Sequence, residues 1–288
     1  MNPVFLKLGP LEIRYYGLMY AIAFVFAIHF AKKEAKDFDL TEDFVDNYAM
    51  VSIISGLLGA RLYYVLFNMD YYLYKPLEIL AVWHGGLAIH GAILGGLVGT
   101  FIYSRLYKTN VWNLTDLAAP YLLFGQTIGR FGNFMNGEVH GVPTFTPLSV
   151  IFSNNKFYEW YEIYLKLPLM EKMNFKELVP WGIVFPPNSP AGDEFPNLAL
   201  HPAMLYEMVL NFFAFLSLIY LKKTKKLNKG ILSFIYIIEY SLIRVFVSFF
   251  RAEDLMIGGF RAPHLISIIL ITWSLIMIFI LNKKKVEG

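Results

Sequence analysis

The sequence predicts an all-α integral membrane protein, a seven-transmembrane-helix bundle with N-out/C-in topology. A small extracytoplasmic head is predicted between helices four and five. Composition is the first reason, because 57% of the 288 residues are hydrophobic and 16% are charged, whereas soluble domains carry about a quarter charged residues. The second reason is the presence of seven long apolar segments. The third is the uneven distribution of basic residues among the loops.

Seven segments come close to the roughly 20 mostly apolar residues that a helix needs to cross the hydrocarbon core. In chain order they are 15–31, 46–68, 79–103, 115–137, 203–221, 231–250 and 265–281. The first ends at Lys32 and Lys33 without a small-residue cleavage site, so we interpret it as an anchor and not a cleaved signal peptide. The fourth is the least apolar. Pro202 and Pro263 stand where helices begin, a position that favours proline.

Lys and Arg in the short loops predict the orientation, because cytoplasmic loops carry an excess of both. With the N-terminus outside, the inside segments hold 13 of them, from Lys32 to Lys285, and the outside segments hold five, from Lys7 to Arg261. The long segment 138–202 is left out of this comparison, since loops of that length are translocated whatever their charge. The N-terminus is therefore expected outside and the C-terminus inside.

The segment 138–202 is the largest extramembrane piece, and we expect it to be a head inserted into a single transmembrane domain, 1–288. It contains nine of the 14 prolines. Within it, 155–166 has the spacing of a helix with one aromatic and one charged face. The aromatic face consists of Phe157, Trp160, Tyr161 and Tyr164. Such a helix either rests on the outer membrane surface or belongs to a small head packed over the bundle, and the sequence leaves both open.

Composition also excludes several kinds of chemistry. Without cysteine, the chain has no disulfide, no thiolate metal site and no cysteine nucleophile. A net charge of +3 gives no reason to expect nucleic acid as a partner. His84 and His90 are six residues apart and fall on different sides of a helix, so they do not form one metal site. These two histidines therefore give no reason to expect a metal.

Ionisable side chains within the predicted spans are few, and groups at membrane depth are costly and usually functional. The ones that we single out are Arg61, His84, His90, Arg130, Glu207, Glu239 and Arg244, with Glu138 and Arg251 near an edge. In the predicted topology these charges gather in the outer half of the bilayer, and His90 lies about mid-depth in span three. A transport pathway should instead continue to both faces.

Span six places two arginines on one helical face, at spacings of four, four and three residues. That face consists of Tyr240, Arg244, Ser248 and Arg251, followed by Glu253 and Asp254. Arginine suits phosphate because its planar guanidinium binds two oxygens and stays charged when desolvated. In span four, Arg130 and Asn133 face the same way. The alternative is that Arg130 pairs with Glu207 or Glu239 and only holds the bundle together.

Span three contains one candidate for chemistry and several for packing. His90 is either a base or a histidine satisfied within the core, and its position alone favours the second interpretation. Gly91, Gly95 and Gly99 follow one another at four-residue steps, a pattern that lets two helices approach closely. We expect these glycines to serve helix packing and assign them no chemistry.

Several stretches of the sequence resemble those of one known family. The stretch GRFGNFMNGE (129–138) is similar to the signature of the prolipoprotein diacylglyceryl transferases, a family of bacterial membrane enzymes. Weaker matches occur in the family's order: RYYGLMY (14–20), GARLYYVLF (59–67), HGGLAIHG (84–91), HPAMLYE (201–207) and RVFVSFFRAED (244–254). The chain departs from the family pattern at Ser248, where the family often has Glu, and at Met204, where it often has a polar residue.

The resemblance implies transfer of a diacylglyceryl group from phosphatidylglycerol to the lipobox cysteine thiol of a prolipoprotein. The products would be a thioether and glycerol phosphate. It also implies a multi-pass protein of the bacterial cytoplasmic (inner) membrane with its active site toward the extracytoplasmic side. The expected partners are phosphatidylglycerol, the signal-peptide and lipobox segment of the precursor, and the bilayer itself. No cofactor is implied.

The resemblance also suggests roles for individual residues. We expect His90, Arg130 and Arg244 to be catalytic, with His90 as the base. The residues expected to bind phosphatidylglycerol are Arg130, Asn133, Asn136, Glu138, Arg244, Arg251, Glu207, Tyr20 and Tyr240. Two other functions stay open, an anion transporter and a non-catalytic phospholipid-binding membrane protein. The transporter is less favoured, because the sequence shows no internal repeat.

Overall fold

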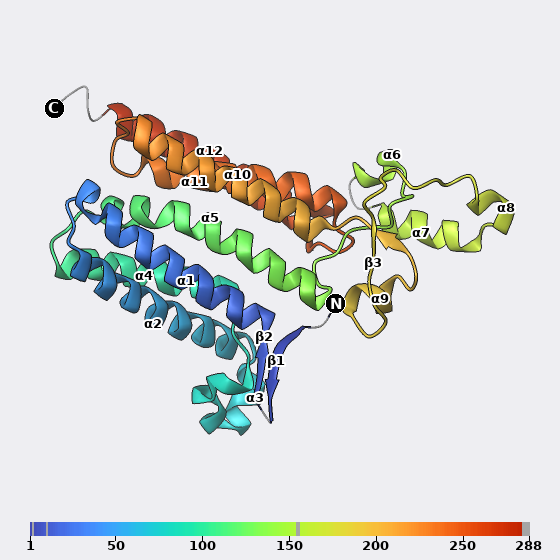
Figure 1. Ribbon diagram of the computed structural model, residues 1–288, viewed down its shortest axis with the longest axis horizontal. Coiled ribbons are helices and arrows are strands. Elements are labelled where there is room, and N and C mark those ends of the chain that lie inside the picture. Colours follow the sequence, from blue (N-terminus) through green and yellow to red (C-terminus); the bar gives the residue numbers. More distant parts are fainter. Residues whose placement is uncertain (2, 10, 154–155, 284–288) are drawn as a thin grey trace. The chain divides into compact units, whose positions relative to one another are not determined.

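The computed structural model describes residues 1, 3–9, 11–153 and 156–283, and most of them are helical (Figure 1). The chain divides into two compact units. Unit 1 contains Met1–Val25 and Ala119–Gly288, and unit 2 contains Phe26–Ala118. The boundaries fall inside two long helices, α1 (Tyr15–Glu34) and α5 (Val111–Asn136), so each of these helices contributes to both units.

Seven helices of at least 18 residues occur in the described part of the chain. Besides α1 and α5 they are α2 (Glu42–Phe67), α4 (Ile89–Leu106), α10 (Ala203–Thr224), α11 (Ile231–Phe250) and α12 (Ala262–Lys283). Six of the seven are long and apolar enough to cross a membrane, and α5 is not among these six. The expected class, a mostly helical integral membrane protein, is therefore confirmed. A seventh span at α5 and the N-out/C-in topology stay predictions.

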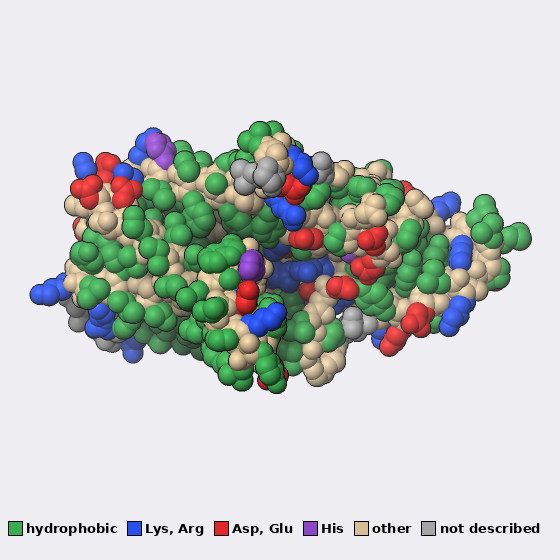
Figure 2. All heavy atoms as spheres, turned by 90° about the horizontal axis from the view of Figure 1, so that it is seen from below, with side chains coloured by type: hydrophobic (Ala, Val, Ile, Leu, Met, Phe, Trp, Pro, Cys, Tyr) green, Lys and Arg blue, Asp and Glu red, His purple; other side chains and the backbone are tan. Residues whose placement is uncertain are grey.

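The apolar side chains of these helices point outward to an extent that a water-soluble protein avoids. Val25, Leu58, Phe213 and Phe279 are each more than 60% exposed, and hydrophobic side chains cover much of the helical surface in Figure 2. Large exposed apolar surfaces mark contact with a membrane or a partner. In helices of this length, the surrounding medium that fits is lipid.

The predicted start of the third span was wrong. Short 3-10 turns occupy Pro76–Leu80 and Val82–His84, and α4 begins only at Ile89. Gly85 (φ 84°) and Gly86 (φ 71°) adopt positive φ values, which interrupt a helix and which glycine tolerates. Apolarity alone did not reveal this interruption. As a consequence, His90 lies in the first turn of α4 and not at the middle of a span.

Unit 2 is held together by close approach of α2 and α4. A Cβ atom on Gly59 of α2 would lie 2.8 Å from the Cα of Gly95, and one on Gly91 would collide with the backbone of Gly59. A Cβ atom on Gly99 would collide with Ser55. The predicted packing role of Gly91, Gly95 and Gly99 is confirmed, because only small residues let helix backbones approach this closely.

Arg61 of α2 is a structural residue of unit 2. Its guanidinium donates to the carbonyl oxygens of Ile79 (2.9 Å), Gly85 (2.6 Å) and Gly86 (3.0 Å), and also to those of Glu78 and Ala81. These carbonyls belong to the turns that precede α4, and those of Glu78 and Ala81 also accept backbone hydrogen bonds within the turns. A charge at this depth is tolerated because backbone oxygens surround it.

Unit 1 combines the C-terminal helices with three small antiparallel hairpins. The hairpins pair β1 (Val4–Leu8) with β2 (Leu11–Arg14), β3 (Ile183–Val184) with β4 (Ala199–Leu200), and β5 (Met256–Ile257) with β6 (Phe260–Arg261). None of them was predicted. The β5–β6 hairpin matters most for the site, because its turn at Gly258 and Gly259 returns the chain toward the end of α11.

The segment 138–202 forms four short helices around an aromatic core. They are α6 (Leu148–Ile151), α7 (Phe157–Lys166), α8 (Leu169–Lys172) and α9 (Pro190–Glu194). The helix predicted at 155–166 is present as α7, while residue 155 lies outside the described residues. Phe157 is 2% exposed, and Tyr161 packs on both Phe157 and Phe195. The aromatic face of α7 thus packs against other residues of this segment, while the placement of the segment as an extracytoplasmic head stays a prediction.

Candidate functional site

The C-terminal end of α5 carries a chain of polar contacts that starts at Arg130. The Arg130 Nη1 donates to the Oδ1 of Asn133 at 3.0 Å, and the Nδ2 of Asn133 donates to the Oε2 of Glu138 at 3.2 Å. Asn136 Nδ2 donates to the other oxygen of Glu138 at 3.3 Å. Gly137, with φ at 68°, turns the chain so that Glu138 reaches back to Asn133. The four predicted residues of this signature therefore meet in one network.

Glu207 of α10 joins this network to α11. Its carboxylate is fully buried and accepts from the Nη2 of Arg130 at 2.5 Å. The other carboxylate oxygen lies 3.8 Å from the Nη1 of Arg244. Buried charges persist only when they are paired, so Glu207 holds two arginines of different helices at a fixed distance from each other. The predicted pairing of Arg130 with Glu207 is present, and the Arg130 side chain is still 20% exposed.

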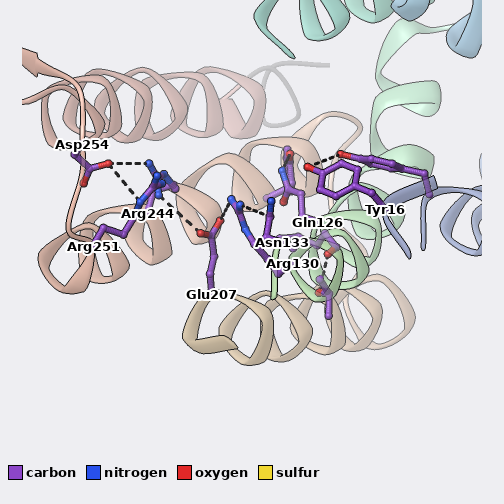
Figure 3. Close-up of polar contacts among 12 residues, drawn as sticks. Tyr16, Gln126, Arg130, Asn133, Glu207, Arg244, Arg251 and Asp254 are labelled. Carbon is purple, nitrogen blue, oxygen red and sulfur yellow. Dashed lines mark hydrogen bonds and ion pairs between the residues drawn. The ribbon is translucent and has the colours of Figure 1, made fainter. Parts of the chain in front are cut away.

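Beyond Arg244, the network continues to the loop after α11. The Nη2 of Arg244 lies 3.4 Å from the Oδ1 of Asp254, and the Nε of Arg251 lies 3.7 Å from the same oxygen. Figure 3 shows how the labelled arginines and carboxylates alternate, from Arg130 through Glu207, Arg244 and Asp254 to Arg251. Glu253 was expected to lie beside Asp254, but its side chain is exposed and is not part of this series of ion pairs.

Positive charge exceeds negative charge in this part of the site. Four arginines contact the two carboxylates of Glu207 and Asp254, and three of their N–H groups have no hydrogen-bond acceptor. Among the described residues, these buried donors are the Nη1 of Arg244, the Nε of Arg251 and the Nε of Arg261. Burial and then the charge of Arg244 lower the pKa of Arg251. An anion that binds beside Arg244 and Arg251 would supply acceptor oxygens and neutralise the excess charge.

Arg261 is a member of this network that the sequence did not single out. It was considered only as a loop residue in the charge comparison. Its side chain is 4% exposed, lies 3.7 Å from the Oδ2 of Asp254 and donates to the carbonyl oxygen of Ser248. The signal that identifies it is the Gly258–Gly259 turn, since a two-glycine hairpin brings the following strand back beside the preceding one.

The two tyrosines predicted to bind the lipid differ in their surroundings. Tyr240 of α11 lies near enough to Glu207 and Arg244 to interact electrostatically with both, and its ring stacks on that of Tyr236. Tyr20 of α1 is 40% exposed, and its hydroxyl donates to that of Tyr16 at 3.4 Å. Tyr240 therefore belongs to the surroundings of Glu207 and Arg244, and Tyr20 interacts electrostatically with Arg130.

His90 belongs to unit 2, and the arginine network belongs to unit 1. The His90 side chain is exposed, with its ring 6.0 Å from that of Tyr63. Its position alone favoured a histidine satisfied within the core, and that interpretation was wrong. Its role as a base stays a prediction.

The remaining charges of the predicted spans have partners of their own. His84 lies 2.8 Å from Glu78, and Glu239 accepts from Ser217 at 2.7 Å. Arg61 is enclosed by backbone carbonyls, as described above. These side chains are accounted for by local structure, and none of their described contacts is with the arginine network.

Comparison with known proteins assigns the family. The family model described as prolipoprotein diacylglyceryl transferase matches residues 3–280. A protein of Fusobacterium nucleatum is 60% identical over 286 residues, which are 99% of either chain. Proteins of Synechococcus elongatus and Oceanobacillus iheyensis are 32% and 34% identical over 99% of this chain and 89% of their own length. All three are named phosphatidylglycerol–prolipoprotein diacylglyceryl transferase. The chain belongs to the prolipoprotein diacylglyceryl transferase family.

Proposed function

We propose that the chain transfers the diacylglyceryl group of phosphatidylglycerol to the lipobox cysteine of a prolipoprotein, with the arginine network of unit 1 binding the lipid phosphate. The donor and the acceptor follow from the names of relatives that match the chain over nearly its whole length. The observation that carries the site assignment is the set of free, buried N–H groups on Arg244, Arg251 and Arg261. A lipid phosphate supplies the acceptor oxygens that these groups lack.

The reaction is a nucleophilic displacement at carbon. The thiolate of the precursor attacks the glyceryl carbon that carries the phosphate ester, a C–S bond forms, and the C–O bond breaks. Its electron pair stays on the departing glycerol phosphate. A free thiol has a pKa of about 8.5, and the ordinary pKa of histidine is about 6.5, so a histidine is mostly neutral near pH 7 and can accept a proton. We propose His90 as the acceptor of the thiol proton. Since the chain has no cysteine, the only thiol in the reaction is that of the substrate.

The arginines are assigned to the leaving group. Negative charge grows on the phosphate as the C–O bond breaks, and fixed cations aimed at that position stabilise the transition state more than the ground state. Arg130 and Arg244 are held for this purpose by Glu207, which contacts both. We assign Arg251 to the same phosphate, because its Nε approaches the same oxygen of Asp254 as Arg244 does.

The remaining predicted residues are assigned to the glycerol headgroup. Asn133, Asn136 and Glu138 form a hydrogen-bonded set beside Arg130, and amide and carboxylate groups can bind hydroxyls as donors or acceptors. Tyr20 and Tyr240 would add hydroxyl groups. The family and the apolar helices indicate a multi-pass bacterial membrane protein. We place its active site toward the extracytoplasmic side, on the basis of the loop charges.

Transfer of labelled phosphatidylglycerol to a lipobox peptide tests this function directly. The purified chain in proteoliposomes should attach the label to the peptide and release glycerol phosphate, whereas a peptide with Ser in place of Cys should stay unlabelled. Lipid binding without release of glycerol phosphate would indicate a phospholipid-binding protein. Anion uptake into the vesicles without lipid consumption would indicate a transporter. Either of these results, without peptide labelling, would overturn the proposal.

A further inference from the structure

Four side chains converge on the carboxylate of Asp254, which lies in the loop between α11 and β5. Arg244 and Arg251 approach its Oδ1 at 3.4 and 3.7 Å, while Arg261 approaches its Oδ2 at 3.7 Å. The hydroxyl of Ser248 donates a short hydrogen bond to the same Oδ2. The Asp254 side chain is 4% exposed, so these contacts take place away from bulk water.

The spacing along α11 explains why a carboxylate is needed at this position. Arg244 and Arg251 are seven residues apart, which is about two helical turns or about 10 Å along the axis. Both side chains are more than 80% buried and carry the same charge, and like charges repel more strongly away from water. The Oδ1 of Asp254 lies within 4 Å of both guanidinium groups. It therefore draws together two cations that would otherwise move apart.

The position of Asp254 is itself fixed from two directions. Ser248, in the last turn of α11, donates its hydroxyl to Oδ2, and its backbone carbonyl accepts from Arg261. Arg261 thus contacts both the helix end and the carboxylate. Cations are favoured near the C-terminal carbonyls of a helix, so Arg261 stabilises the end of α11 while it anchors Asp254. Ser248 uses both its hydroxyl and its carbonyl in these contacts, whereas Arg261, like Arg244 and Arg251, keeps one buried N–H group without an acceptor.

We infer that Asp254, anchored by Arg261 and Ser248, is a positioning residue that sets the orientation of Arg244 and Arg251 toward the substrate phosphate. This inference rests on the phosphate-binding role proposed above. Arg244 is held between Glu207 on one side and Asp254 on the other, so loss of Asp254 frees one end of its guanidinium. Asp254 acts through the arginines and takes no part in bond making or breaking.

The Asp254→Asn variant separates positioning from simple charge attraction. It adds one unit of positive charge to the site, so the substrate anion should bind at least as tightly as before. Misplacement of a catalytic group by about 1 Å can cost about 10²-fold in rate. We therefore expect kcat to fall about 10- to 100-fold while KM for phosphatidylglycerol stays the same or decreases. Glu253→Gln is the matched control, because it removes the same charge from the neighbouring exposed residue and should leave both constants unchanged.

A carboxylate exchange shows whether the effect is specific. Since the Ser248 hydroxyl touches the Asp254 carboxylate, the double variant Ser248→Asp with Asp254→Ser returns a carboxylate to the same place. It should recover at least about 10-fold of the kcat that Asp254→Ser loses, by the same positional argument. A variant that had only unfolded would show no such recovery, and thermal unfolding of each variant in detergent identifies that case.

The results separate this inference from the proposed function. If the unaltered chain labels no lipobox peptide, the proposed function fails. If the unaltered chain is active and Asp254→Asn has the same kcat, only the positioning role fails. A rise in KM with unchanged kcat would likewise overturn it, because that result would make Asp254 a contributor to ground-state binding.

Discussion

Replacing Glu207 by Gln is the most informative single perturbation, because this carboxylate is fully buried between two arginines. It lies 2.5 Å from the Nη2 of Arg130 and 3.8 Å from the Nη1 of Arg244. With an effective dielectric constant of about 20, Coulomb's law gives attractions of about 7 and about 4 kcal/mol for these two pairs. The desolvation of a buried carboxylate offsets much of this gain. Removal of one partner from a buried ion pair typically costs about 3–5 kcal/mol.

Gln keeps the size of the side chain and one acceptor oxygen for Arg130, so we expect the lower end of that range, a loss of about 3 kcal/mol. Glu239→Gln is the matched control. Glu239 also lies on a membrane helix, but its described contact is a hydrogen bond from the neutral Ser217 at 2.7 Å. A neutral amide is less costly to bury than a carboxylate, so this variant should be as stable as the unaltered chain or more stable.

The measurement is the free energy of unfolding in mixed detergent and denaturant micelles, for both variants in parallel. Glu207→Gln should unfold at clearly lower denaturant than Glu239→Gln, and it should also lose transfer activity because Arg130 and Arg244 lose their common partner. Equal stability of the two variants would refute the reasoning. In that case the arginines would be balanced by groups other than Glu207, and the network would not hold α5, α10 and α11 together.

Three further predictions concern single side chains. Arg244→Ala should reduce kcat about 10²- to 10³-fold in the peptide-labelling assay, since it removes a charge-stabilising donor; activity close to normal would exclude Arg244 from the phosphate site. His90→Gln has similar size but no basic nitrogen, so its rate should fall about 10²-fold or more if His90 takes the thiol proton, and an unchanged rate and pH–rate profile would exclude His90 as the base. Burial lowers the pKa of His201 to about 4 from its ordinary 6.5. The unfolded chain therefore binds a proton at higher pH than the folded chain, and stability should fall by up to about 3 kcal/mol as the pH drops from 6.5 toward 4. A His201→Gln variant that keeps the same pH dependence of unfolding would show that another group is responsible.

Much of the fold was predictable because membrane helices carry a strong sequence signal. Length and apolarity located the helices, and the four-residue glycine steps identified the contact between α2 and α4. The start of α4 was not predictable in this way, since the segment 79–88 is as apolar as a helix and only the backbone at Gly85 and Gly86 shows otherwise. The hairpins were not predicted for a similar reason, because strands of two to five residues are too short to show a clear alternation of apolar and polar residues.

The candidate site was predictable where its residues lie on one helix. Arg130 with Asn133, and Arg244 with Arg251, follow from helical spacing alone. The contacts between helices did not follow from spacing. Glu207 had two candidate partners before the structure placed it between Arg130 and Arg244. Arg261 was missed because it is a loop residue, and its burial depends on the hairpin that returns it to the end of α11.

The two departures from the family pattern have different structural consequences. Met204, in the first turn of α10, is fully buried and belongs to the aromatic and aliphatic core of the head, together with Val142, Phe185 and Leu200. Because methionine is apolar, its burial among these hydrophobic side chains requires no hydrogen-bond partner, whereas a buried polar side chain would need one.

Ser248 is buried as well, but its hydroxyl is used by Asp254. A glutamate at this position would add a carboxylate beside an existing one, and the four arginines would then face three buried acids. With serine, Glu207 and Asp254 alone balance those arginines, and more positive charge is left for a bound phosphate. The serine therefore makes the site of this chain more dependent on Asp254. Asp254→Asn should consequently lower kcat more in this chain than in a relative that carries glutamate at the position of Ser248.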